Sequence, residues 1–148
     1  MSVSIRSKEW VVVCDGAKAL VLENAGDAQD LNLKTREVFE QPDQPTHEFG
    51  TDAPGRAMNS VGGRRSAVEQ TDWHERSEQA FLEELAKRLD AHIAAGQVKS
   101  IVLCAPPRAL GVLRQAYSPA LRAAVRVEID KDFVKVPVHE IEQRLTAA

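Results

Sequence analysis

Residues 10–23 read WVVVCDGAKALVLE, and this stretch decides the fold. Trp10–Cys14 is short, apolar and rich in β-branched valine, which is typical of a buried strand. Asp15 and Gly16 follow, and then a second apolar run, Lys18–Glu23. An Asp-Gly pair between two apolar runs predicts a tight hairpin, because glycine supplies the positive φ that a primed turn needs. The stretch therefore predicts two antiparallel strands at the start of a sheet.

A third strand and a long helix are predicted further along the chain. Leu33–Glu40 alternates in polarity, so the first forty residues form a three-stranded meander. Apolar residues recur at helical spacing from Phe81 to Ile93, which predicts a helix over about Trp73–Ala95. Asp72 and the glutamate three residues later have the spacing of a capping box, which favours a helix start at this point.

The rest of the chain alternates between strands and helices. Two prolines end one buried strand, and proline is tolerated in the first turn of the helix that follows. The predicted elements are a strand at Lys99–Ala105, a helix at Arg108–Ala116, a helical turn or two through Ala124, a strand at Val125–Ile129 and a helix at Pro137–Leu145. The order βββαβαβα predicts a single α/β domain with a mixed five-stranded sheet and helices packed on it. We expect the ribonuclease-H-like strand order 3-2-1-4-5, with the second strand antiparallel to the others.

Length and charge restrict the classes of function. The chain has 148 residues, which fits one domain, and its net charge is −3. No general positive field attracts nucleic acid, so any such contact must be local. The first residues lack the apolar run of a secretory signal, and no apolar run is long enough to cross a membrane. We therefore expect a cytoplasmic protein without membrane insertion.

The two cysteines, Cys14 and Cys104, each end an apolar strand-like run. In a domain with a substantial core this pattern favours buried thiols in a reducing compartment. A disulfide bridge stays open as an alternative, because the two strands are expected to be neighbours.

Patterns that carry catalysis or cofactor binding are absent from the sequence. A metal-dependent nuclease on this fold needs several converging carboxylates, and only Asp15 stands at a suitable strand end. The Asp-Gly turn explains Asp15 better, so we reject the nuclease. The four histidines have no partners at metal-site spacing, and no phosphate-binding glycine motif is present. We expect no metal and no cofactor, and no residue can be assigned a catalytic role.

A long polar segment, residues 41–71, is the main candidate for function. It has almost no apolar periodicity, and long loops of this kind are usually functional or disordered. Between Ala53 and Val68 it contains no acid, and its charges come from three arginines. Paired glycines let a ligand approach the main chain, and arginine suits phosphate. The proposed binding loop for RNA or another anion is Arg56, Gly62, Gly63, Arg64 and Arg65; the alternative is a solvated loop with incidental charge.

Several motifs resemble a bacterial family, the host attachment proteins, also described as proteins required for attachment to host cells. The resemblance covers essentially the whole chain, and its most specific part is Ala105–Arg108 with the Leu-Gly that follows. The other matching motifs are the WVVVCDGAKA of residues 10–19, Pro54-Gly55-Arg56, Gly62-Gly63-Arg64, Glu75 and Lys131-Asp132.

This family in turn resembles the middle domain of the eukaryotic and archaeal peptide release factor. That domain has the same topology and carries a Gly-Gly-Gln tip between its meander and its long helix. Here Gly62-Gly63 stands in the corresponding place, and Arg64 replaces the glutamine. Arginine keeps the backbone amide that can donate to developing negative charge, but it lacks the side chain that orients water. The resemblance therefore implies contact with the ribosome or tRNA more than hydrolysis.

Three hypotheses follow. The first is a translation-associated module whose Gly-Gly-Arg-Arg segment contacts ribosomal or transfer RNA. The second is a weak peptidyl-tRNA hydrolase, which the missing glutamine disfavours. The third is a non-catalytic protein-interaction or attachment factor, which the family description suggests. Overall we lean against an enzyme.

Overall fold

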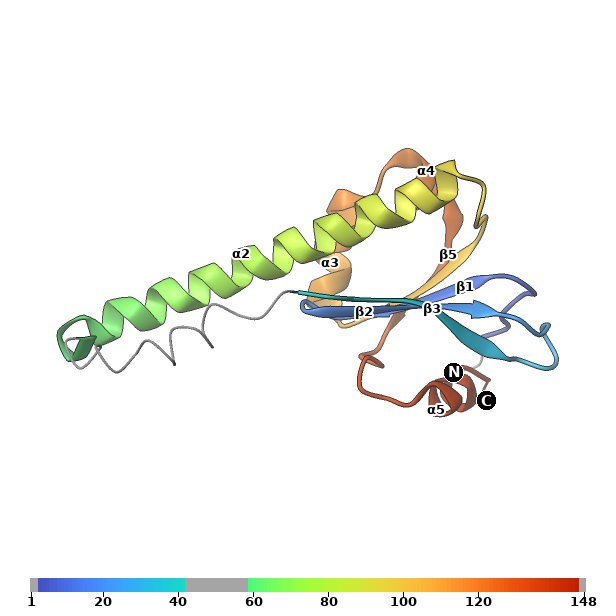
Figure 1. The fold of residues 1–148 in the computed structure, drawn as a ribbon, viewed down its shortest axis with the longest axis horizontal. Coiled ribbons are helices and arrows are strands. Elements are labelled where there is room, and N and C mark those ends of the chain that lie inside the picture. The colour runs from blue at the N-terminus through green and yellow to red at the C-terminus, as the bar shows by residue number, and fades with distance from the viewer. Residues whose placement is uncertain (1–2, 42–58, 147–148) are drawn as a thin grey trace.

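The chain folds into one mixed sheet with helices on both faces (Figure 1). The computed structural model describes the backbone of residues 3–41 and 59–146, and the side chains of residues 3–41 and 74–146. The strand order is β3-β2-β1-β4-β5, and β2 is antiparallel to β1 and β3, while β1, β4 and β5 are parallel. The predicted fold class and strand order are confirmed. The elements are β1 (Trp10–Cys14), β2 (Lys18–Asn24), β3 (Leu33–Glu40), α2 (Asn59–Ala94), β4 (Ile101–Ala105), α3 (Pro107–Ala116), α4 (Pro119–Ala124), β5 (Val125–Asp130) and α5 (Val138–Thr146).

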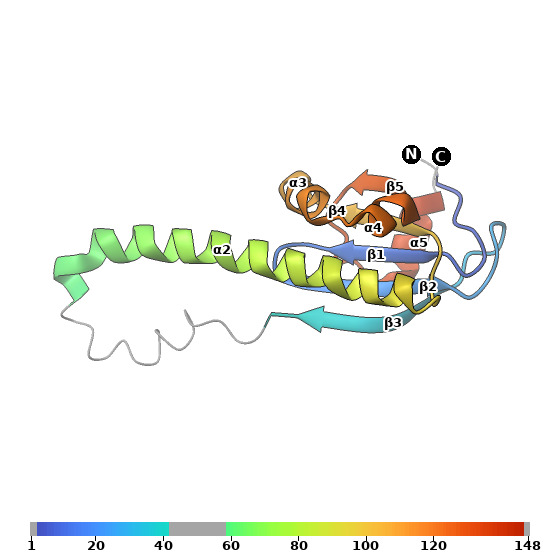
Figure 2. The same ribbon diagram turned by 90° about the horizontal axis from the view of Figure 1, so that it is seen from above.

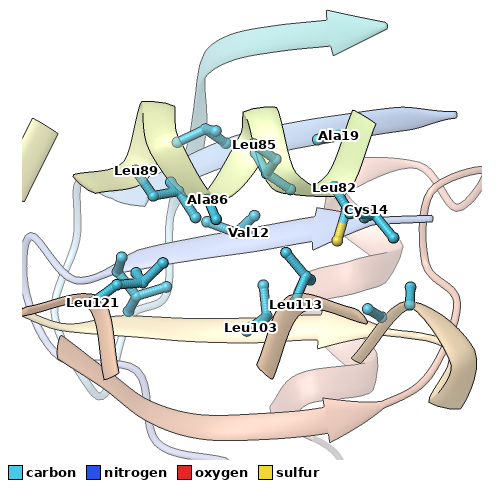
Figure 3. Close-up of a cluster of buried hydrophobic side chains, with 14 of the residues drawn as sticks. Val12, Cys14, Ala19, Leu82, Leu85, Ala86, Leu89, Leu103, Leu113 and Leu121 are labelled. Atoms are coloured by element: carbon cyan, nitrogen blue, oxygen red, sulfur yellow. The ribbon is translucent and has the colours of Figure 1, made fainter. Parts of the chain in front are cut away.

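Two apolar cores lie on opposite faces of the sheet. Helices α2, α3 and α4 cover one face and α5 covers the other (Figures 1 and 2). On the first face, leucines of α2 pack over β1 and β4, with Leu113 of α3 and Leu121 of α4 beside them (Figure 3). Every residue of β1 is buried, because this strand lies in the middle of the sheet and faces both cores. This explains why Trp10–Cys14 is continuously apolar rather than alternating.

The two cysteines belong to different cores. Cys14 lies in the core under α2, and Cys104 lies in the core under α5. Their strands are neighbours, but Cys104 is paired with Val13, so the two thiols point to opposite faces of the sheet. Both thiols are free and buried, as expected, and the disulfide alternative is wrong.

The hairpin between β1 and β2 forms where it was predicted, but for a different reason. Within the described residues, Gly96 is the glycine with a positive φ, so Gly16 does not form the primed turn that we expected. The turn is closed by Asp15, whose Oδ1 accepts hydrogen bonds from the backbone N–H groups of Ala17 (2.8 Å) and Lys18 (2.9 Å). An aspartate that bonds the backbone two residues further on forms an Asx-turn, which needs no left-handed residue.

The long helix begins much earlier than the sequence predicted. Helix α2 starts at Asn59 rather than near Trp73, so the backbone of residues 59–71 is helical and not part of a loop. The remainder of the expected loop, residues 42–58, lies outside the described residues. Local pattern favoured a start at Asp72, but residues 64–70 (RRSAVEQ) contain no proline and several good helix formers. The predicted end is nearly right, since Gly96 (φ 76°) follows α2 and its N–H donates to the carbonyl of Ile93.

Candidate functional site

Four of the five predicted site residues lie in the first turns of α2. The helix includes Gly62, Gly63, Arg64 and Arg65. The structure describes the backbone of these residues but not their side chains. Arg56 lies outside the described residues. The prediction that residues 62–65 form a loop is therefore wrong, because their backbone continues the helix that was expected to begin after them.

The first half of α2 extends beyond the end of the sheet. Figures 1 and 2 both show the green part of this helix away from the strands, while its yellow part lies over them. Among residues 74–94, Phe81 is the first buried position, and the preceding ones are exposed or half-buried. We call residues 59–74 the arm. Sixteen residues of α-helix span about 24 Å at ~1.5 Å each, so residues 62–65 stand well away from the core.

We call the sheet and the helices packed on it the body of the protein. A cleft lies where the arm joins the body. Its volume is about 410 Å³. It is formed by the β1–β2 turn, the carboxyl end of β4, the first residues of α3 and one face of α2. In open α/β sheets, ligands commonly bind outside the carboxyl ends of parallel strands, and β1 and β4 both end here. The lining residues are Asp15, Gly16, Ala17, Glu75, Glu78, Gln79, Leu82, Pro106, Arg108, Ala109 and Val112.

Arg108 of α3 bridges two glutamates of α2 across the cleft. Its Nη2 lies 3.5 Å from Glu75 Oε1 and 3.7 Å from Glu78 Oε1. The three side chains are 66%, 56% and 44% exposed, so water screens both ion pairs. Pairs of this kind contribute at most about 1 kcal/mol to stability. Arg108 therefore contributes little to the stability of the fold.

The backbone of the β1–β2 turn touches α2 closely. A Cβ atom added to Gly16 would lie 2.7 Å from Cγ and 2.8 Å from Cδ of Glu78, which is closer than real contacts allow. The side chain of Gln41, just after β3, joins the same two elements. Its Nε2 lies 3.0 Å from both the carbonyl oxygen of Gly16 and that of Ser77. Glycine at position 16 leaves room for the Glu78 side chain where it stands, and it is not needed there for its backbone angles.

The nuclease interpretation rested on Asp15, at the end of β1, and this residue has a role in the turn. Asp15 uses one oxygen to close its turn, which supports the interpretation of Asp15 as a turn residue. Within residues 3–41 and 74–146, no three His, Cys, Asp or Glu side chains are grouped as metal ligands. Two arginines of α3 are paired with acids: Arg108 contacts Glu75 and Glu78, and Arg114 Nη2 lies 2.7 Å from Glu128 Oε1.

Comparison with known families decides the relationship. The profile of the family described as "protein required for attachment to host cells" matches residues 10–145, nearly the whole chain. The chain belongs to this family. No curated protein matches the chain significantly. Three of the motifs on which we noted the resemblance to the host attachment family meet at the cleft, where Asp15–Ala17, Glu75, Pro106 and Arg108 are lining residues.

Part of this site was beyond sequence analysis. Gln41 and Glu78 were not singled out, because their partners are 25 and 62 residues away in the chain and no local pattern marks them. The sequence predicts Gly16 as a turn residue, and this role leaves no reason to expect its contact with Glu78 of α2. None of the helices in the described part of this attachment-family protein is long and apolar enough to cross a membrane.

Proposed function

We propose that this chain is a translation-associated RNA-binding module, whose arm presents Gly62, Gly63, Arg64 and Arg65 to ribosomal or transfer RNA. The observation that carries the proposal is the position of these residues on a helix that extends about 24 Å beyond the cleft. A slender helix bearing arginine can enter a groove or tunnel that the body of the protein cannot. The ribosome offers such spaces lined by phosphate.

The charge of the arm supports RNA as the partner. The chain as a whole carries a net charge of −3, and yet residues 53–68 contain three arginines and no acid. Within the arm, Arg64 and Arg65 stand toward the far end, and its two acids, Glu69 and Asp72, stand nearer the body, so the positive charge of the arm is confined to its outer half. Arginine donates to phosphate oxygens in a planar fork, and this makes its contacts with a nucleic-acid backbone strong. The resulting affinity must fall as salt rises, because binding releases counterions.

The glycine pair supports close contact with the backbone of the arm. Each glycine in a helix interior costs about 1 kcal/mol relative to alanine, so Gly62 and Gly63 weaken the arm they belong to. Two adjacent positions without side chains leave one stretch of helix open to a flat or bulky ligand, such as a nucleotide. This also fits the resemblance to the release-factor middle domain, which carries a Gly-Gly-Gln tip in the same place.

We propose binding rather than catalysis. Arg64 stands where the release-factor tip has glutamine, so the side chain that orients water for ester hydrolysis is missing. A role on the ribosome implies that the protein works in the cytoplasm. The attachment phenotype in the family description is then an indirect effect of altered translation.

Co-sedimentation with bacterial ribosomes tests the proposal. We would compare the native chain with the double variant Arg64→Ala/Arg65→Ala at several salt concentrations. The matched control is Lys99→Ala/Lys131→Ala, which removes the same charge from two exposed positions on the body. We expect salt-sensitive association that is lost in the arginine variant and kept in the control.

Other outcomes have clear meanings. Equal loss in both variants would show a general charge effect and contradict a role for the arm. If none of the three proteins associates with ribosomes or tRNA, RNA binding is wrong, and the family's attachment role must be sought among protein partners. Hydrolysis of peptidyl-tRNA by the native chain, lost on replacing Gly63 and Arg64, would instead support the hydrolase.

A further inference from the structure

The arm leaves the body at one group of contacts. Among the described side chains of α2, residues 74–94, Phe81 is the first one buried in the core, and the helix then remains packed over the sheet through Leu85 and Leu89. Glu78 and Glu75 lie about one and two turns before Phe81, between the buried part of α2 and the arm. The core residues all lie on one side of α2. They hold the helix down on the sheet, but other contacts are needed to restrain a sideways tilt of the arm.

Three separate elements of the body touch α2 at the base of the arm. The β1–β2 turn approaches through Gly16, which faces the Glu78 side chain without room for a Cβ. Gln41, at the end of β3, donates from one amide nitrogen to the carbonyl oxygens of Gly16 and Ser77. Helix α3 contributes Arg108, which spans Glu75 and Glu78 on the cleft face of α2, the face that Gly16 also meets. Figure 2 shows β3 and α3 on opposite sides of α2.

We infer that these contacts form a clamp that fixes the direction of the arm. The clamp consists of Gly16, Gln41 and Arg108 on the body and Glu75, Ser77 and Glu78 on α2. It acts from two sides, and contacts on opposite sides of a rod resist sideways tilt in both directions. Gly16, Glu75 and Arg108 also belong to the motifs by which the chain resembles its family, which gives those motifs a mechanical role.

The clamp has a consequence for binding that rests on the proposed function above. An arm held in one direction loses less conformational freedom when it enters an RNA site than a swinging arm does. Clamp residues then improve binding without touching RNA, so they are positioning residues. Their loss leaves the arginines of the arm intact and changes only where the arm points.

Distances between spin labels test the clamp directly. One label replaces Ser66 on the arm, and the second replaces either Gln115 on α3 or Lys34 on β3, which are both exposed. The native cysteines are fully buried and do not compete for the label. Ser66 lies nine residues before Glu75, or about 14 Å along the helix, so a tilt of about 15° moves it by roughly 4 Å.

The key variant is Gly16→Ala, which places a Cβ against Glu78. Glu78 must move away from the new Cβ, by rotation of its side chain or together with α2, and either movement disturbs its pair with Arg108. We therefore expect a shift or clear broadening in at least one of the two distance distributions. The double variant Gly16→Ala/Glu78→Ala removes the clashing side chain and, with it, the Arg108–Glu78 pair, so the centre of each distribution returns to its native value while its width stays larger than in the native protein. Gly111→Ala is the matched control, because a Cβ at Gly111 meets nothing within 4 Å.

A second variant keeps the test decisive if Gly16→Ala fails to fold. Gln41→Ala/Arg108→Ala removes polar contacts at partly exposed positions and leaves the core unchanged; it must broaden both distributions. Unchanged distributions in whichever of these variants fold would overturn the clamp.

The clamp and the proposed function fail in different ways. Unchanged distances together with ribosome association that depends on Arg64 and Arg65 would reject the clamp alone. Shifted distances in a protein whose native form does not associate with ribosomes would reject the proposed function alone. If both are right, Gly16→Ala weakens ribosome association and Gly16→Ala/Glu78→Ala recovers it in part.

Discussion

A buried carboxylate joins the N-terminal segment to the edge of the sheet, and its removal gives a prediction of definite size. The side chain of Glu9 is only 1% exposed and forms a two-pronged ion pair with Arg126 of β5. Arg126 Nε donates to Oε2 (2.7 Å) and Nη2 donates to Oε1 (2.8 Å). The Ser100 hydroxyl and the N–H of Arg6 (2.9 Å) donate to the same carboxylate. We consider the variant Arg126→Ala.

The cost follows mainly from the two charged hydrogen bonds to Glu9, and the variant also removes a third bond, from Arg126 Nη2 to the carbonyl oxygen of Ser4 (2.7 Å). A hydrogen bond to a charged group contributes about 1.5–3 kcal/mol, and breaking a buried pair leaves an uncompensated charge. Arg126 itself is 28% exposed, so water can enter when its side chain is removed and offset part of the loss. We therefore expect Arg126→Ala to lower the free energy of unfolding by about 2–4 kcal/mol at pH 7.

The cost must depend on pH in a definite direction. Burial raises the pKa of Glu9, but the hydrogen bonds from Arg126, Ser100 and Arg6 outweigh it, and the pKa lies below its ordinary value. The ionised carboxylate thus stabilises the native chain above about pH 4.3, the pKa of unfolded glutamate, and this stabilisation is lost as pH falls through the lower folded value. Without Arg126, burial is no longer outweighed, so the pKa of Glu9 rises in the variant. The difference between the two proteins therefore shrinks as the solution is acidified.

Urea unfolding at pH 7 and at pH 4 measures both effects. The control is Arg144→Ala, which removes an exposed i,i+4 pair with Glu140 and should cost about 0.5 kcal/mol or less. A cost for Arg126→Ala no larger than that of the control, or one that grows on acidification, would refute the reasoning.

Further predictions concern the thiols, the core and the arm. Burial raises the pKa of Cys104 to about 12 and that of Cys14 further. Neither thiol should therefore react with an alkylating reagent at pH 8 until the protein unfolds, and oxidation should not join them. A disulfide in the native protein would contradict their placement on opposite faces of the sheet. Leu113→Ala, at a fully buried position, should cost about 2–5 kcal/mol in urea unfolding, and a loss below 1 kcal/mol would mean that α3 is not packed there. The double variant Gly62→Ala/Gly63→Ala should slow amide hydrogen exchange in the arm about 15- to 30-fold, because each alanine favours the helix by ~0.8–1 kcal/mol. Unchanged exchange would show that this segment is not helical in solution.

The sheet could be predicted from sequence because its signals are local. The continuous apolar run Trp10–Cys14 marks a central strand, and the Asp-Gly pair marks the turn after it. The reason for the glycine could not be predicted in the same way. Gly16 is required by Glu78, a residue 62 positions later, and only the folded chain brings the two together.

The start of α2 was missed because two local signals disagreed with the extent of the helix. The Asp72 and Glu75 spacing resembles a helix start, and the glycine pair resembles a loop. Both occur inside one helix, whose first half has no core-facing stripe to reveal it. Side-chain pairs between distant segments, such as Glu9 with Arg126, have no sequence signal either. These same distant contacts are what position the arm and the N-terminal segment.

The salt dependence of ribosome binding tests the central claim most directly. Each phosphate contact contributes about 0.7–0.9 to the slope of log affinity against log salt concentration. If Arg64 and Arg65 each contact one phosphate, Arg64→Ala/Arg65→Ala reduces the magnitude of the slope by about 1.4–1.8, while Lys99→Ala/Lys131→Ala leaves it unchanged. A native slope near zero, or a slope that does not change in the arginine variant, would contradict RNA binding by the arm.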